Sequence, residues 1–277
     1  MIKILLKRKV ALIAAIYLCI IVLLGVTASV VAPFPRNEQH VSDRLTAPNQ
    51  TYLLGTDNLG QDILSQIIYG CQMTLIGSLG IVTFSVVFGT ILGVFAGYFP
   101  KFRALVMRLI DALMAFPPLL LAMVLVTILG QGMVNVIVAI GAYFMTRMTR
   151  IVYGLTLQIR EETYIEAERS LGASQFRIVF KHIIPNLLSP IIVQATFTFS
   201  SSLLQMASLD YLGLGIPPKY PTWGNMLSVG KDYMTVAPWM VMIPGIIIVL
   251  TVLSLNIVGD LLRDNADPKF RDLMKGA

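Results

Sequence analysis

The feature that most limits how this chain can fold is a set of five long stretches that contain no charged residue. They cover residues 10–35, 63–100, 112–146, 182–209 and 233–259. A helix rises about 1.5 Å per residue, so about 20 apolar residues cross the hydrocarbon core of a bilayer. Every stretch is long enough, and only 13% of the 277 residues are charged, against about 25% in soluble domains. We therefore expect an integral membrane protein, and not a soluble enzyme, a DNA-binding domain or a disordered tail.

Two of the stretches are too long to be a single membrane span. The third would form a helix of roughly 50 Å, and Gly130-Gln-Gly132 at its centre is a turn signal. We divide it into spans near residues 104–129 and 133–155, and we expect Phe116-Pro-Pro118 to kink the first of them. Gln66, Gly70 and Gln72 interrupt the second stretch, so its span is expected near residues 74–98. The sequence thus predicts an all-α protein with six transmembrane helices.

The basic residues indicate how the spans are oriented. Seventeen lie on the side of the amino terminus: Lys3, Lys7, Arg8, Lys9, Lys101, Arg103, Arg108, Arg147, Arg150, Arg160, Arg169, Arg177, Lys181, Arg263, Lys269, Arg271 and Lys275. Four lie on the other side: Arg36, Arg44, Lys219 and Lys231. Cytoplasmic segments of membrane proteins carry the excess of Lys and Arg, so both termini are expected in the cytoplasm. Residues 10–32 exceed the apolar region of about 7–15 residues in a signal peptide, so they are expected to remain as the first span.

The long external loop, from residue 33 to about residue 72, shows two patterns. Ile63, Leu64, Ile67 and Ile68 share a helical face, which predicts a short helix in the outer interface or packed on the bundle. The segment Gly55-Thr-Asp-Asn-Leu-Gly60 has the glycine spacing of a phosphate-binding loop but lacks the Lys-Ser/Thr that should follow it. Because no other segment supplies such a loop, this chain is not expected to hydrolyse ATP by itself.

Two features inside the spans leave alternatives open. Gly89, Gly93 and Gly97 form a stripe of small residues that lets another helix approach closely, either from this chain or from a second subunit. Asp210 lies near the outer end of the fifth span. It is either a carboxylate wetted by an aqueous loop or vestibule, which we favour, or a residue of a translocation path.

Residues 158–185, between the fourth and fifth spans, predict two short amphipathic helices. In the first, Thr163 and Glu166 allow a capping box; Tyr164, Ala167 and Leu171 share one face, and Gly172 ends the helix. In the second, Phe176, Val179, Phe180 and Ile183 share a face, and Pro185 ends the helix. Such a pair suits docking to another protein, although a re-entrant hairpin without a partner has the same pattern.

This segment resembles the EAA loop of ABC importer permeases, in Glu166-Ala-Glu168, Gly172 and Ile183-Ile-Pro185. It departs from the family pattern at Glu168, where Ala is usual, and at His182, where Ile is usual. The run Lys181-His-Ile-Ile-Pro-Asn186 is similar to the peptide and nickel branch of the family. Three further blocks resemble the C-type subunit of that branch: Leu54–Leu64, Tyr211-Leu-Gly-Leu-Gly215 with Pro221-Thr-Trp-Gly224, and Asn256–Asp264 with Asp267-Pro268. Asp210 stands where the family has a small or neutral residue.

The resemblance implies an assembly in a bacterial cytoplasmic membrane. Its members would be this permease, a homologous second permease that forms a heterodimer with it, two cytoplasmic ATPase subunits and an extracellular substrate-binding protein. ATP and Mg would bind to the ATPase subunits, this chain would hold no cofactor or metal, and nucleic acid is not expected as a partner. The coupling residues it implies are Glu166, Ala167, Glu168, Gly172, Ala173, Phe176 and Pro185. The domains are 1–72 (tail, first span and external loop), 73–264 (ABC type-1 permease domain) and 265–277 (cytoplasmic tail).

The cargo implied by the resemblance is a di- or oligopeptide, with nickel or a metal chelate as the alternative. No His, Cys or carboxylate cluster has the spacing of a metal site, but the binding protein of such a system does most of the selecting. A secondary carrier or channel would also show six spans and would need no EAA loop. An intramembrane enzyme would need buried catalytic groups, and the only histidines are His40 and His182.

Overall fold

The computed structural model describes residues 9–266, which are mostly helical and contain no β-strand within that range. The all-α prediction is therefore confirmed. Before the long bundle come α2 (Lys9–Val26), α3 (Ala28–Val31) and the 3-10 turn η1 (Val41–Asp43). The remaining elements are α4 (Ile63–Tyr98), α5 (Pro100–Met114), α6 (Pro118–Leu129), α7 (Met133–Arg160), α8 (Thr163–Ser170), α9 (Gln175–Ile178), the π-helical turn η2 (Val179–Ile183), α10 (Ile184–Tyr211), α11 (Trp223–Gly230), the 3-10 turn η3 (Lys231–Tyr233) and α12 (Trp239–Ala266).

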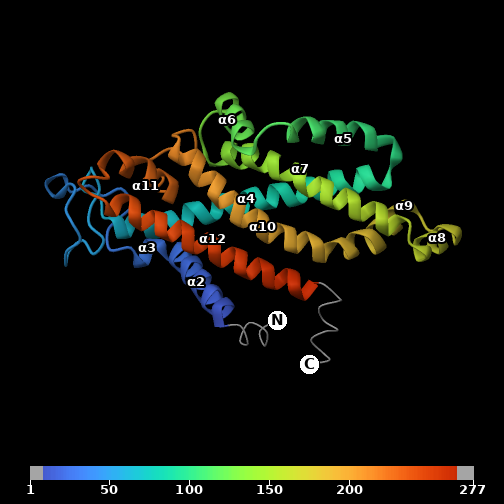
Figure 1. Ribbon diagram of the computed structural model, residues 1–277, viewed down its shortest axis with the longest axis horizontal. Helices are drawn as coiled ribbons and strands as arrows, with labels where there is room; N and C mark the ends of the chain where they lie inside the picture. The colour runs from blue at the N-terminus through green and yellow to red at the C-terminus, as the bar shows by residue number, and fades with distance from the viewer. Residues whose placement is uncertain (1–8, 267–277) are drawn as a thin grey trace.

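The long helices lie along a common axis. Figure 1 shows α4, α7, α10 and α12 running along the long axis, with α8 and α9 at one end and α11 with the loop before α4 at the other. We call these the hairpin end and the loop end. Several residues used in the sequence analysis lie outside the described residues: Lys3, Lys7, Arg8, Asp267, Pro268, Lys269, Arg271 and Lys275.

Five helices in the described part of the chain are long and apolar enough to cross a membrane. They are Lys9–Val26, Ile63–Tyr98, Met133–Arg160, Gln175–Tyr211 and Trp239–Asp264. The pair α5 and α6 passes the same test only together and is bent by 98°, so six spans are reached if this pair counts as one. The expected turn at Gly130–Gly132 is confirmed, because α6 ends before it and α7 begins after it. The kink expected at Phe116-Pro-Pro118 is a complete break, so the span at 104–129 is not one helix.

The interruption expected at Gln66, Gly70 and Gln72 is absent, because α4 is continuous from Ile63 to Tyr98 and contains the span expected near residues 74–98. The residues expected to form a separate interfacial helix are its first turns, and the domain boundary placed after residue 72 falls inside it. Asp62 caps this helix, since its carboxylate accepts the Ser65 N–H at 2.8 Å. Gly70, which looked like a break, lies where a Cβ would come within 2.8 Å of Trp223 Cδ1. The small residue therefore accommodates packing by a distant side chain and does not end the helix.

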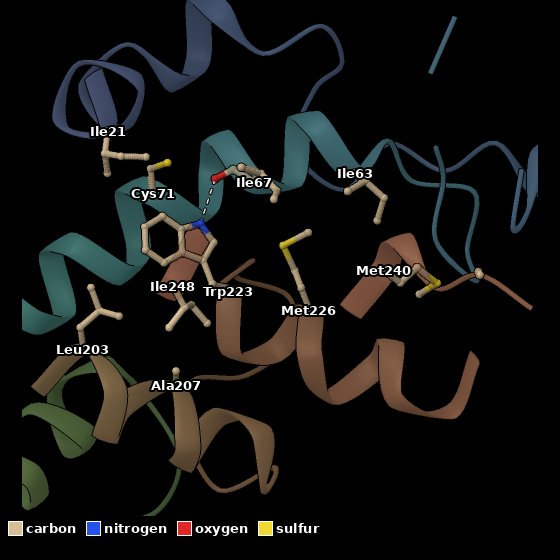
Figure 2. Close-up of a cluster of buried hydrophobic side chains, with 11 residues drawn as sticks. Ile21, Ile63, Ile67, Cys71, Leu203, Ala207, Trp223, Met226, Met240 and Ile248 are labelled. Atoms are coloured by element: carbon tan, nitrogen blue, oxygen red, sulfur yellow. Dashed lines mark hydrogen bonds between the residues drawn. The ribbon is translucent and has the colours of Figure 1, made fainter. Parts of the chain in front are cut away.

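The Trp223 side chain forms the centre of a buried cluster at the loop end. Figure 2 shows its ring between Cys71 of α4 and Ile248 of α12, with the indole N–H pointing to the Ile67 carbonyl. That hydrogen bond measures 3.3 Å, and Trp223 is fully buried. A buried indole is stabilised when its N–H finds an acceptor, so this one residue holds α4, α11 and α12 together.

The external loop packs onto the same end of the bundle. The Trp239 indole donates to the Thr56 carbonyl at 3.1 Å. The Asp57 carboxylate accepts the backbone N–H groups of Leu59 and Gln61 at 2.7 and 2.8 Å, and the Gln66 amide at 2.6 Å. The glycine-spaced segment at 55–60 is thus a turn that the Asp57 carboxylate organises through these hydrogen bonds.

The tightest helix contact joins α4 to α7 through the glycine stripe. A Cβ on Gly89, Gly93 or Gly97 would lie 2.6–2.7 Å from the Cβ of Met148, Val152 or Thr156, respectively. These three partners are spaced by four residues along α7, so two stripes of matching period meet face to face. Of the two alternatives for the stripe, packing within this chain is therefore confirmed.

Candidate functional site

The segment between α7 and α10 folds as a helical hairpin that projects from the hairpin end (Figure 1). It consists of α8, a tight turn at residues 171–174, α9 and the π turn η2. The two short helices predicted for this segment are present. What the hairpin can do depends on which of its side chains are anchored in the bundle and which are left exposed.

The turn has the hydrogen bonds of a Schellman motif. The Gly172 N–H donates to the Arg169 carbonyl at 3.1 Å, and the Ala173 N–H donates to the Glu168 carbonyl at 3.0 Å. Gly172 has φ +83°, the left-handed conformation that glycine adopts without penalty. Ser174 then caps α9, because its hydroxyl accepts the Arg177 N–H at 3.3 Å. The prediction that Gly172 ends the first helix is confirmed.

Three aliphatic side chains anchor the hairpin. Ile165 of α8, Ile178 of α9 and Ile183 of η2 are each at most 1% exposed. They belong to one buried cluster with Val152 of α7 and Leu187 of α10. The hairpin is therefore packed on the bundle as a fixed extension of α7 and α10, and any force on it acts on both helices. Sequence analysis missed Ile165 and Ile178, although an isolated aliphatic residue in each polar helix was a signal for them.

The surface of the hairpin that faces away from the bundle is apolar and charged. Leu171, Phe176 and Phe180 are 85%, 73% and 65% exposed. The same segment exposes charged side chains of both signs: Glu161, Glu162, Glu166, Arg169, Arg177 and Lys181. Large exposed apolar side chains among charged ones are the composition of a protein-binding surface. We call Leu171, Phe176, Phe180 and Glu166 the hairpin surface.

Three details of this segment differ from the sequence prediction. The capping box is not formed, because Glu162 occupies the N-cap position and Thr163 is already helical. Pro185 does not end the second helix: it lies in the first turn of α10, which continues from η2. In that π turn the Ile184 N–H reaches the Val179 carbonyl, five residues back.

The apolar side chains of this second helix do not share one face. Phe176, Val179, Phe180 and Ile183 were expected on one face. Val179 and Ile183 are instead buried, whereas Phe176 and Phe180 are exposed. In the first helix Tyr164, Ala167 and Leu171 are all exposed, and Ile165 alone is buried.

A small polar cluster joins α8 to the beginning of α10. The His182 Nε2 and Glu168 Oε1 atoms are 3.5 Å apart, and both side chains are partly buried. The Asn186 amide donates to the His182 carbonyl at 2.6 Å and to the Tyr164 hydroxyl at 3.4 Å. Glu168 and His182 are the two positions at which this segment departs from the EAA pattern. The structure places the two side chains next to each other, so they form an ion pair when His182 is protonated.

The expectation that Asp210 is wetted by an aqueous loop was wrong. Its side chain is 1% exposed. One carboxylate oxygen accepts the Ile216 N–H at 2.8 Å, and the other accepts the Thr222 hydroxyl at 2.7 Å. Thr222 in turn caps α11 by accepting the Asn225 N–H at 3.1 Å. Asp210 therefore ties the end of α10 to the loop and helix that follow it.

The candidate residues thus fall into two separate places. Glu166, Ala167, Gly172, Phe176 and Pro185 are exposed on or beside the hairpin, and Glu168 and Ala173 are partly buried within it. Asp210 lies near the other end of α10, about 25 residues and some 38 Å of helix from Pro185. The structure does not bring Asp210 together with the hairpin.

A bundle of membrane-length helices with an exposed helical hairpin at one end defines the class of polytopic membrane proteins. Residues 85–272 match the family model described as "Binding-protein-dependent transport system inner membrane component", and residues 1–48 match "N-terminal TM domain of oligopeptide transport permease C". The first match covers more than half of the chain. This chain therefore belongs to the family of binding-protein-dependent transport permeases.

Relatives are similar in sequence to this chain over nearly its whole length. The chain is 40% identical to the "Di/tripeptide transport system permease protein DppC" of Pseudomonas aeruginosa, over 96% of this chain and 90% of that protein. It is 38% identical to the "Glutathione transport system permease protein GsiD" of Pectobacterium atrosepticum, over 96% and 89%. Among solved structures, an inward-facing MetNI methionine ABC transporter gives a TM-score of 0.59 at 20% identity, over 72% of this chain and 95% of that chain. The structural match supports the fold alone.

Proposed function

We propose that this chain is the C-type permease subunit of an ATP-driven importer of di- or oligopeptides. The observation that carries the proposal is the family membership together with the functions of the relatives, which are di/tripeptide and glutathione permeases. ATP and Mg would be bound by separate ATPase subunits, and this chain would have no catalytic role of its own. The alternative cargo, nickel or a metal chelate, is tested below.

The orientation we propose places the hairpin end in the cytoplasm of a bacterium and the loop end outside. Lys101, Arg160 and Lys181 lie in segments at the hairpin end, whereas Arg36 and Lys219 lie in segments at the loop end. This distribution follows the excess of basic residues in cytoplasmic segments. Both termini would then be cytoplasmic, and the loop end would face an extracellular substrate-binding protein.

We propose that the hairpin surface docks onto one ATPase subunit, and that a second, homologous permease subunit completes the pore. The exposed Phe176 and Phe180 supply apolar contact, and Glu166 is available for a basic group on the ATPase. Because Ile165 and Ile183 are packed in the bundle, movement of the ATPase would displace α7 and α10 directly. ATP binding would in this way change the state of the bundle.

The test is uptake in a deletion strain complemented with variants of this chain. We expect Gly172→Pro and Glu166→Lys to abolish uptake of a labelled dipeptide while the amount of protein in the membrane stays normal. The exposed Thr163, which no cap or partner requires, supplies the matched control Thr163→Ser. Normal uptake by either test variant would refute the coupling role.

The cargo is identified by measuring uptake of a dipeptide, a longer peptide and nickel ion in the same strains, with and without ATP depletion. Loss of only the peptide signals, restored by complementation and dependent on ATP, is the expected result. Selective loss of nickel uptake would show that the cargo is a metal ion or a metal chelate. Complementable uptake that survives ATP depletion would overturn the assignment to an ATP-driven importer.

A further inference from the structure

A groove lined by both polar and apolar side chains runs along one side of α10, between α7 and α12. Its volume is about 790 Å³, within the range of about 300–1,000 Å³ for small-molecule sites. The polar side chains that line it are Arg147, Asn186, Ser189, Gln194, Ser201 and Arg263. From Asn186 to Ser201 the groove follows α10 for about 22 Å, so it reaches from the hairpin end well into the bundle.

Arg147 lies at the middle of α7, about 20 Å of helix from either end. A guanidinium on a helix of membrane-spanning length is unfavourable against lipid tails and is normally found facing a water-filled cavity, the interior of a bundle or the interface. Arg147 is exposed and lines the groove. The groove is therefore a wet surface of the protein, to be covered by something other than lipid.

The charge of the groove is positive and unbalanced. One turn further along α7, Arg150 forms an ion pair with Asp111. Among the residues that the structure describes, neither Arg147 nor Arg263 has an ion-pair or hydrogen-bond partner, and no carboxylate lines the groove. Two unpaired guanidinium groups beside amide and hydroxyl side chains form a site suited to a carboxylate or a phosphate.

We propose that this groove is the half of the translocation path nearest the hairpin, and that Arg147 and Arg263 bind the C-terminal carboxylate of the cargo there. The inference rests on the proposed function, because it takes the cargo to be a peptide. A peptide leaving the pore would pass from Ser201 toward Asn186 with its carboxylate held by one guanidinium and then the other. The polar side chains of α10 replace water along this course.

The first experiment measures the electrostatic potential in the groove and needs no cargo. In the reconstituted complex, with Cys19 and Cys71 replaced by alanine, Ser201→Cys is treated with an anionic and a cationic methanethiosulfonate reagent. Two nearby positive charges raise the local concentration of anions, so we expect the anionic reagent to react about fivefold faster. Adding Arg147→Gln should reduce this preference to about twofold or less. Arg150→Gln, which removes a paired arginine outside the groove, should leave the preference unchanged.

Leu204→Cys is the matched control for access, since Leu204 lies one turn from Ser201, is 52% exposed and does not line the groove. We expect neither reagent to label it. Failure of both reagents to label Ser201→Cys in the complex would show that the partner subunit fills the groove and would overturn the proposal. Equal rates for the two reagents would overturn the role of the arginines.

The second experiment tests the carboxylate itself. Alanyl-alanine on the side of the hairpin should slow labelling of Ser201→Cys at least about twofold, whereas alanyl-alanine amide should not. Equal protection by both would overturn carboxylate binding. If labelling is blocked in vesicles with phosphatidylglycerol but not with phosphatidylcholine alone, the arginines hold a lipid phosphate and the proposal fails. Because the measurement of electrostatic potential uses no cargo, its outcome is separate from whether the uptake assay finds peptide or nickel.

Discussion

The glycine stripe makes a prediction whose magnitude follows from distances in the structure. In Gly93→Ala the new Cβ would lie 2.6 Å from Val152 Cβ and 2.8 Å from the Thr149 carbonyl oxygen. Carbon atoms in contact are about 3.5–4.0 Å apart, so α4 and α7 must separate by about 1 Å. Since the obstacle includes backbone, no rotamer change relieves it. Overpacking of this kind costs about 1–3 kcal/mol.

The control for this prediction is Gly154→Ala, on α7. A Cβ at Gly154 would have no atom within 4 Å, and alanine favours a helix over glycine by up to about 1 kcal/mol. Gly154→Ala should therefore be neutral or stabilising, and the two variants should differ by about 1–3 kcal/mol, because the helix-propensity gain is common to both. The assay is unfolding of the purified protein by dodecyl sulfate in mixed micelles, followed by the fluorescence of its two tryptophans. Equal unfolding midpoints for the two variants would refute the close contact between α4 and α7.

Three further changes test the site. Asp210→Leu should lower the free energy of unfolding by about 1–3 kcal/mol in the same assay, because it leaves the buried Thr222 hydroxyl without its acceptor. Asp210→Asn keeps an acceptor oxygen and should lose less stability, so equal losses for the two variants would contradict the buried hydrogen bonds. In a double-mutant cycle on the free energy of unfolding, Glu168→Gln and His182→Gln should show a coupling energy of about 0.2–1 kcal/mol. Strictly additive effects would mean that their contact contributes nothing to stability. Gly172→Ala should destabilise the turn by about 1–2 kcal/mol, because φ at this position is +83°. The expected result is faster amide hydrogen exchange in α8, and unchanged exchange would argue against the left-handed turn.

Features encoded within a few residues could be predicted from the sequence. The break at Gly130–Gly132 and the turn at Gly172 both depend on glycine conformations within a few residues, and the structure has both. The long apolar stretches likewise predicted membrane-length helices, because the length needed to cross a bilayer is a property of a single helix. The glycine stripe predicted a close helix contact without identifying the partner.

Features that depend on distant residues could not be predicted in this way. The continuity of α4 through Gly70 depends on Trp223, about 150 positions later in the chain. The burial of Asp210 depends on Thr222 and on a loop that folds back over the end of α10. The faces of the second hairpin helix were misassigned because burial there is decided by the bundle, against which Val179 and Ile183 pack and Phe176 and Phe180 do not. No local pattern marks these three arrangements.

The π turn has a mechanical consequence for the whole of α10. From Gln175 to Tyr211 the chain is one helix, but its ladder of hydrogen bonds is altered at η2 and is interrupted again by Pro190. Helices bend most easily at such points, so this one has a hinge between residues 179 and 190. One side of the hinge is fixed to the hairpin by Ile178, and the far end is fixed by Asp210. A bend at this hinge would change the width of the groove, because Asn186 and Ser189 line the groove there.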